Sequence, residues 1–130
     1  MILLDTHAWI WHLSDPSQLS AAARVAIDDA RRDLAVHVSS ISVWELFMLT
    51  KKSRLQLAIA PEAFLHRAER LSYVRFAAVD NGVARRSVQL PDIHGDPADR
   101  LILATAQQLG CPVVSKDRRL SDYPDAEIIW

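Results

Sequence analysis

The stretch Ile2-Leu3-Leu4-Asp5-Thr6 joins three consecutive apolar residues to a carboxylate and a hydroxyl. A short apolar run without alternating polar residues is typical of a strand buried on both faces, as strands of a parallel sheet are. Residues 6–13 follow, apolar almost all round, and predict a first helix that is either deeply buried or covered by a partner. This stretch therefore predicts the first strand–helix unit of a parallel α/β fold.

The same alternation continues along the rest of the chain. Apolar runs predict further strands at residues 34–39, 74–79, 113–115 and 128–129. Capping residues and apolar periodicity predict helices at residues 20–32, 42–52, 61–71, 80–88 and 96–109. Gly110 and Pro112 would end the last of them. Short apolar strands that alternate with helices predict one α/β domain over residues 1–130, with a mainly parallel sheet.

Composition narrows the class of protein. The chain has 130 residues, of which 50% are hydrophobic, so it can build a core. Its net charge of −1 gives no overall basic field, so any positive potential for a polyanion must be local or come from a metal. The single Cys111 excludes an intrachain disulfide and a Cys-rich zinc site. No run of about 18 apolar residues occurs, and we expect a cytoplasmic protein without a membrane partner.

Four acidic residues adjoin segments that should be buried, where a carboxylate is costly unless it is paired, hydrogen-bonded or metal-bound. They are Asp5, Glu45, Asp99 and Asp117. Strand ends and the helix starts that follow them lie at one edge of a parallel sheet, so we expect these four side chains to meet there. Clustered carboxylates without Cys or His partners suit Mg²⁺ or Mn²⁺, which can activate water for attack on a phosphate.

Each acid also has a simpler interpretation. Asp5 and Asp96 could cap the helices that follow them, and Glu45 fits the last position of a capping box at residues 42–45. Asp99 could form a local ion pair with the neighbouring arginine, and Asp117 could be an ordinary loop acid. The coincidence of four acids at one edge is what favours a shared site.

Two other classes of function remain open from the residues alone. A receiver-type signalling module that responds to phosphate also has acids at strand ends, with Asp80 as its phosphoacceptor and Lys116 after a late strand. Such modules need a pair of acids after the first strand, which Asp5-Thr6 does not supply. A non-catalytic interaction domain is the other alternative, suggested by the apolar first helix.

Four segments in order resemble the PIN-domain ribonucleases, and more narrowly the VapC-type toxins of bacterial toxin–antitoxin pairs. The segments are Leu3-Leu4-Asp5-Thr6-His7, Ser42-Val43-Trp44-Glu45, His94-Gly95-Asp96-Pro97-Ala98-Asp99-Arg100-Leu101-Ile102 and Val114-Ser115-Lys116-Asp117-Arg118-Arg119. The resemblance covers nearly the whole chain. It implies a three-layer α/β/α sandwich with a five-stranded parallel sheet in the order 3-2-1-4-5.

The resemblance also implies an activity and partners. We expect a Mg²⁺- or Mn²⁺-dependent endoribonuclease in which Asp5, Glu45, Asp99 and Asp117 hold the metal and Asp96 is an additional acid. Residues expected around these acids or on the substrate are Thr6, Ser115, Arg100 and Lys116. The expected substrate is RNA, either transfer RNA or ribosomal RNA. The expected partners are a second copy of the chain and a small antitoxin that inserts an Arg or Lys among the carboxylates.

Overall fold

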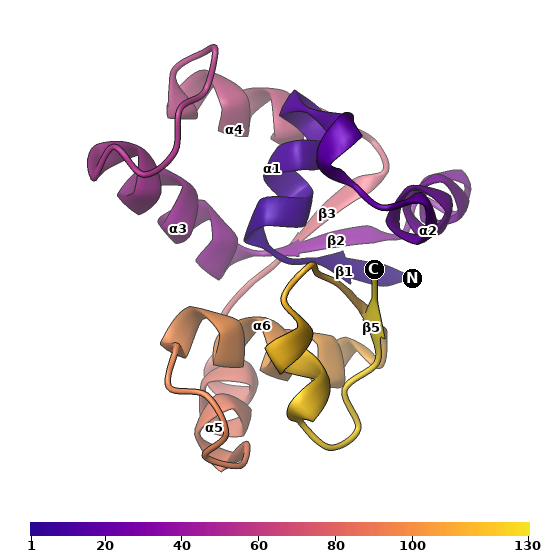
Figure 1. The fold of residues 1–130 in the computed structure, drawn as a ribbon, viewed down its shortest axis with the longest axis vertical. Helices are drawn as coiled ribbons and strands as arrows, with labels where there is room; N and C mark the ends of the chain where they lie inside the picture. The colour runs from indigo at the N-terminus through magenta and orange to yellow at the C-terminus, as the bar shows by residue number, and fades with distance from the viewer.

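The structure is a computed structural model that describes all 130 residues. Its strands form one sheet in the order β3-β2-β1-β4-β5 (Figure 1), and every neighbouring pair is parallel. The strands are β1 (Ile2–Leu4), β2 (Val36–Ser39), β3 (Val74–Ala77), β4 (Val113–Val114) and β5 (Ile128–Ile129). The predicted parallel sheet and its order are confirmed.

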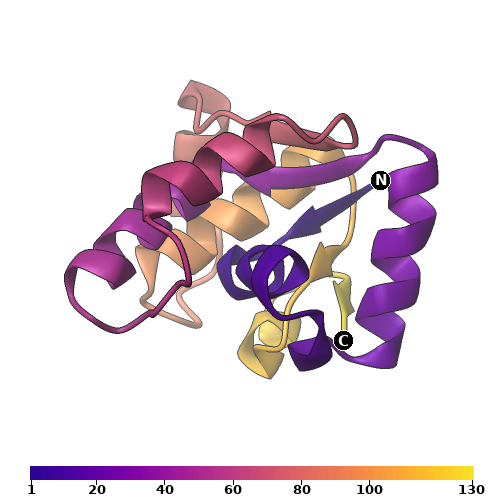
Figure 2. The ribbon, with the colours of Figure 1, turned by 90° about the horizontal axis from the view of Figure 1, so that it is seen from above.

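Helices cover both faces of the sheet, which gives the expected three layers (Figures 1 and 2). The helices are α1 (Thr6–Ser14), α2 (Ala21–Arg32), α3 (Ser40–Lys51), α4 (Pro61–Glu69), α5 (Asn81–Gln89) and α6 (Pro97–Leu109), with short 3-10 helices η1 (Pro16–Gln18) and η2 (Arg118–Asp122). Helices α1–α4 line the larger core cluster on one face, and α6 and η2 line the smaller cluster on the other, with α5 packed against α6. None of these helices has the length and apolar character needed to cross a membrane.

Side chains of β1 divide the core between the two faces. Ile2 and Leu4 belong to the larger cluster under α1–α4, whereas Leu3 belongs to the smaller cluster under α5 and α6. Successive side chains of a strand point to opposite faces, so a strand covered on both sides must be apolar throughout. This burial explains the apolar run from which the fold was predicted.

The apolar first helix is covered by the rest of the chain. Trp9 and Ile10 of α1 are fully buried, and the Trp9 ring meets Phe64 and Phe76 edge to face at 5.3 and 5.8 Å between ring centres. The deeply buried alternative holds for this side of α1, whereas Trp11 and Leu13 are only partly buried.

Helix α3 begins two residues earlier than predicted. Ser39, the last residue of β2, caps it by accepting the backbone N–H of Ile41 at 3.3 Å. The capping box at residues 42–45 is thus wrong, because β2 runs into α3 without an intervening loop. Ser42 is fully buried, and Glu45 lies in the second turn of the helix.

The position of β3 does not suit a receiver-type site. β3 lies at one edge of the sheet, and β2 separates it from β1. Asp80, which follows β3, caps α5 by accepting the backbone N–H of Val83 at 2.9 Å, and it also accepts from Gln108. A phosphoacceptor there would lie away from Asp5, which follows β1.

Candidate functional site

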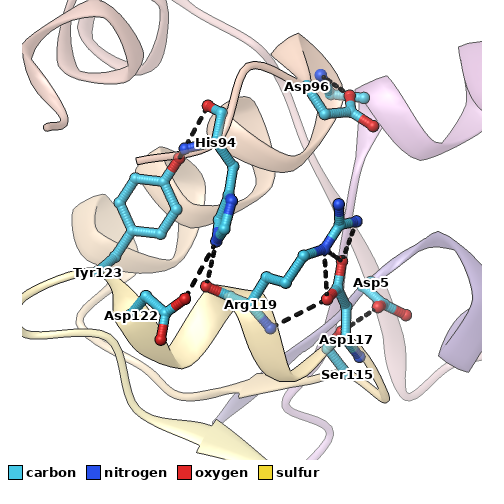
Figure 3. Close-up of polar contacts among 9 residues, drawn as sticks. Asp5, His94, Asp96, Ser115, Asp117, Arg119, Asp122 and Tyr123 are labelled. Carbon is cyan, nitrogen blue, oxygen red and sulfur yellow. Dashed lines mark hydrogen bonds and ion pairs between the residues drawn. The ribbon is translucent and has the colours of Figure 1, made fainter. Parts of the chain in front are cut away.

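Asp5 and Asp117 lie just beyond the ends of the neighbouring strands β1 and β4, and one serine joins them (Figure 3). The Ser115 hydroxyl donates to the Asp5 carboxylate and accepts the backbone N–H of Asp117 at 3.0 Å. Asp5 also caps α1, because its Oδ1 accepts the backbone N–H of Ala8 at 2.7 Å. Burial raises the pKa of Asp5, and these two hydrogen bonds oppose the rise. Capping α1 does not remove Asp5 from the acidic group.

Glu45 reaches the same group from α3. Its Oε1 accepts the Thr6 hydroxyl at 2.5 Å, and the Thr6 oxygen lies 2.9 Å from the hydroxyl of the buried Ser42. Burial raises the pKa of Glu45, the bond from Thr6 lowers it, and the charge of Asp96 raises it further. Glu45 therefore faces the start of α1 rather than the start of its own helix.

Asp99, in the first turn of α6, is the acid that the others surround. Its pKa is raised from 3.8 to about 7, first by burial and then by neighbouring negative charge. In order of size, the charges come from Asp96, Glu45, Asp117 and Asp5. The charges of these four carboxylates thus reach Asp99 from the helix starts and strand ends at this edge of the sheet, although the side chains do not form a close cluster.

Asp96 has both roles that the sequence allowed. It caps α6, since its Oδ1 accepts the backbone N–H of Ala98 at 2.9 Å, with Pro97 in the first turn as predicted. Its side chain is exposed, yet among the acids its charge has the largest effect on the pKa of both Asp99 and Glu45. Asp96 is therefore part of the acidic group as well as a cap.

Arg100 does not pair with the adjacent Asp99. Its guanidinium donates instead to the backbone carbonyls of Ser87, Leu90 and Pro91 at 2.9, 2.7 and 2.8 Å. These bonds hold the connection between α5 and α6 against the start of α6. The local ion-pair interpretation of Asp99 is wrong, because tertiary contacts use the arginine elsewhere.

The other residues expected around the acids divide into two kinds. Thr6 and Ser115 donate hydrogen bonds to acids, as predicted. Lys116 is exposed and makes no ion pair with them. Its Nζ lies 5.8 Å from the centre of the Trp11 ring, a cation–π distance.

Arg119 contacts the acidic group, although it is not among the residues expected there from the sequence. Its Nε lies 3.0 and 3.2 Å from the two carboxylate oxygens of Asp117, and its Nη2 lies 2.7 Å from Oδ2 (Figure 3). This pairing lowers the pKa of Asp117, although partial burial opposes the shift. The signal available in the sequence was the spacing: an arginine two residues after an acid that caps a short helix.

His94 anchors the backbone of Arg119. Because a carbonyl can only accept, His94 Nε2 carries the proton and donates to the Arg119 carbonyl at 2.7 Å. The Tyr123 hydroxyl in turn accepts the backbone N–H of His94 at 3.0 Å and donates to its carbonyl at 3.1 Å. The loop before α6 and the helix η2 are thereby tied together on one side of the acids (Figure 3).

The donor chemistry of the group fits a hard divalent cation, since its acceptor groups are carboxylate and hydroxyl oxygens. Mutual repulsion, visible at Asp99, is what a bound cation would relieve. However, no three His, Cys, Asp or Glu side chains stand close enough together to hold a metal ion as they are oriented here. Hydroxyls, backbone N–H groups and Arg119 hold four of the five acids in other contacts, all but Asp99.

Comparison with known proteins identifies the family. A family model described as the PIN domain matches residues 2–126. Ribonuclease VapC22 of Mycobacterium tuberculosis (strain ATCC 25618 / H37Rv) is 41% identical to this chain, over 99% of the chain and 98% of the relative.

Solved structures that resemble this chain share its fold over nearly the whole length. VapBC2 from Rickettsia felis, bound to a DNA fragment from its promoter, has a TM-score of 0.73 at 13% identity, covering 98% of this chain and 97% of that one. FitAcB from Neisseria gonorrhoeae has a TM-score of 0.69 at 27% identity, covering 98% and 96%. The first likeness shows the fold alone. With the family model matching almost the full length, the chain belongs to the PIN domain family.

Proposed function

We propose that this chain is a metal-dependent endoribonuclease that acts as the toxin of a toxin–antitoxin pair. The observation that carries the proposal is the pair of acids beyond β1 and β4, Asp5 and Asp117, which Ser115 joins. Glu45, Asp96 and Asp99 lie near enough for the acidic charges to raise the pKa of Asp99. The 41% identity to a ribonuclease over the full length supports the same chemistry and the same substrate class.

In this proposal Asp5, Glu45, Asp99 and Asp117, with Asp96 as an auxiliary, would hold Mg²⁺ or Mn²⁺. The bound cation would lower the pKa of a water molecule and offset the charge of the phosphodiester. Thr6 and Ser115 orient Glu45 and Asp5 through their hydroxyls, so that the carboxylates are fixed before substrate arrives. Asp99, with no donor of its own, has both oxygens free for the cation.

The proposed partners follow from the relatives. The solved structures with this fold include toxin–antitoxin complexes, which supports a small antitoxin partner for this chain. The relative named a ribonuclease supports RNA as the substrate, with transfer and ribosomal RNA both remaining predictions. A homodimer also stays a prediction. The exposed Trp44 on α3, with 56% of its surface accessible, is a candidate for that contact.

RNA cleavage by purified protein, freed of any antitoxin, tests the function. With Mn²⁺ the wild type should cut total cellular RNA into discrete fragments, and EDTA should stop the reaction. Asp99→Asn should lower the rate by at least about 100-fold, because it removes the central carboxylate.

The matched control is Asp33→Asn, at an exposed acid that ends α2 away from the group. This variant should cleave like the wild type. The function is wrong if wild-type protein leaves RNA intact with Mn²⁺, or if Asp99→Asn cuts as fast as the control.

A further inference from the structure

Asp117 is the one member of the acidic group whose charge is neutralised by an ion pair. Arg119 grips it with two nitrogens at 2.7 to 3.2 Å, and the backbone N–H of Arg119 adds a bond to Oδ1 at 3.0 Å. No other Lys, Arg or His side chain forms an ion pair with Asp5, Glu45, Asp96 or Asp99. A cation supplied by the chain itself thus occupies a carboxylate that the proposed function assigns to a metal ion.

The main chain of Arg119 is fixed while its side chain is free to move. His94 holds its carbonyl at 2.7 Å, and the neighbouring Leu120 and Tyr123 are 1% and 2% exposed. By contrast, the Arg119 side chain is 64% exposed. The guanidinium can therefore leave Asp117 by rotation about side-chain bonds, without any change in η2.

The contact is also of a kind that a divalent cation can displace. Exposed ion pairs contribute little to stability, because water screens them and two long side chains must be held still. A guanidinium and a metal ion compete for the same carboxylate oxygens, so only one of them can hold Asp117 fully. An Arg119 side chain displaced from Asp117 would lie beside the acids with its N–H donors unpaired. The planar arrangement of these donors matches the spacing of two phosphate oxygens.

We propose that Arg119 is an arm with two positions, closed on Asp117 in the metal-free protein and turned onto the phosphodiester when a metal ion takes Asp117. The proposal rests on the proposed function, because it assigns Asp117 to the metal and RNA to the site. The proposal assigns Arg119 as a phosphate-binding residue. It also gives a reason why the carboxylates of the metal-free protein do not lie close enough together to coordinate a metal ion.

The first test needs no RNA. Mn²⁺ binding is measured by calorimetry for wild type, Arg119→Gln and Arg118→Gln. Arg118 is the matched control, since it is the next residue, exposed, of equal charge and without an ion pair. We expect Arg119→Gln to bind Mn²⁺ roughly two- to fivefold more tightly, as loss of an exposed ion pair implies, and Arg118→Gln to bind like the wild type.

The second test adds RNA. Cleavage of total transfer RNA with saturating Mn²⁺ should show a KM raised roughly three- to tenfold in Arg119→Gln, with a smaller change in Arg118→Gln. Tighter metal binding combined with weaker RNA binding is the expected signature, because a purely structural role would not move the two in opposite directions. A third measurement uses no variant: Mg²⁺ titration should shift the NMR signal of the Arg119 Nε–H group as the arm opens.

The outcomes separate the two proposals. The wild type could bind Mn²⁺ and cut RNA while Arg119→Gln matches Arg118→Gln in both tests. In that case the proposal of a movable Arg119 is wrong and the proposed ribonuclease function stands. The arm is also wrong if Mg²⁺ binds without moving the Arg119 signal. If the wild type neither binds Mn²⁺ nor cuts RNA, both proposals fail together.

Discussion

At the residue scale, Asp99 shows how the acidic group is built. Burial and four neighbouring carboxylates raise its pKa to about 7, and no hydrogen bond or cation opposes them. Asp5 and Glu45 each receive a hydroxyl, and Asp117 receives a guanidinium. The uncompensated acid is therefore the central one, where an added cation would relieve the most repulsion.

Because no hydrogen bond or cation offsets the negative charge around Asp99, we predict that the stability of the metal-free protein depends on pH. A carboxyl with a raised pKa in the folded state contributes stability that is fully present below pH 4 and is lost as the pH rises through about 7. Asp99→Asn, which stays neutral, should therefore melt above the wild type at pH 8. Because the site is only partly buried, we expect roughly 1 kcal/mol, or a few degrees.

Thermal melts of both proteins in EDTA from pH 4 to pH 8 check this expectation. The gap between them should shrink as the pH falls from 7 towards 4, because Asp99 becomes protonated in the folded state below about 7 and in the unfolded state only near its ordinary value of 3.8. An equal gap at every pH would mean that Asp99 acts on stability through something other than its charge. A lower melting temperature for Asp99→Asn at pH 8 would contradict the repulsion directly.

At the scale of elements, one buried hydroxyl couples α1 to α3. Thr6 begins α1 and touches both Glu45 and Ser42 of α3, which are 39 and 36 residues away in the sequence. Glu45 lies beyond the first turn of its own helix, so it does not cap that helix. The contact with Thr6 is therefore what orients its side chain. The position of one acid is thus set by the packing of two helices.

Thr6→Val tests this coupling. The substitution keeps the shape of the side chain but removes the donor, so Glu45 loses its partner. We expect RNA cleavage to fall about 10- to 100-fold, the usual effect of losing a residue that orients a metal-binding group. The control is Thr105→Val, since Thr105 is equally buried but bonds only to a carbonyl of its own helix, that of Leu101.

Thr105→Val should retain wild-type cleavage. Circular dichroism and melting curves establish that both variants fold. If Thr6→Val cleaves as well as Thr105→Val, the hydroxyl does not position Glu45 for the reaction.

At the scale of the whole molecule, Arg100 holds together the half of the structure that carries α5, α6 and η2. It donates to the carbonyl of Ser87 in the last turn of α5 and to those of Leu90 and Pro91 just after it, and its Nη1 lies 3.4 Å from the Tyr123 hydroxyl near the end of η2. The position of η2, and hence of Asp117 and Arg119, depends on this network. The sequence led us to expect Arg100 around the acids or on the substrate, and the contacts seen here hold the segments beside the acids in place.

Arg100→Gln should accordingly change stability. The shorter amide cannot reach all three carbonyls, and unfilled acceptors that are partly buried should cost about 1–3 kcal/mol. Urea unfolding measures the loss. Arg85→Gln, at an exposed arginine of α5 for which no hydrogen bond or ion pair is seen, should unfold like the wild type. Equal midpoints for the two variants would contradict this role.

Much of the fold was predictable because its signals are local. Apolar runs such as residues 2–4 marked the strands, and Ser20, Asp80 and Asp96 marked helix starts that the structure confirms. The start of α3 was missed because Ser39 both ends a strand and caps a helix, so the later serine looked like the better cap. Helix η2 was missed because a short 3-10 helix has no apolar period to detect.

The sequence alone determined the alternation of strands and helices, and from it the expectation that the acids lie at one edge of the sheet. These follow from interactions within a few residues and from the common direction of parallel strands. Only the tertiary structure decided what each acid touches, such as Ser115 on Asp5 across 110 residues and Thr6 on Glu45 across 39. Such contacts depend on how helices pack around the sheet, and no local pattern encodes the distance between side chains so far apart in the chain.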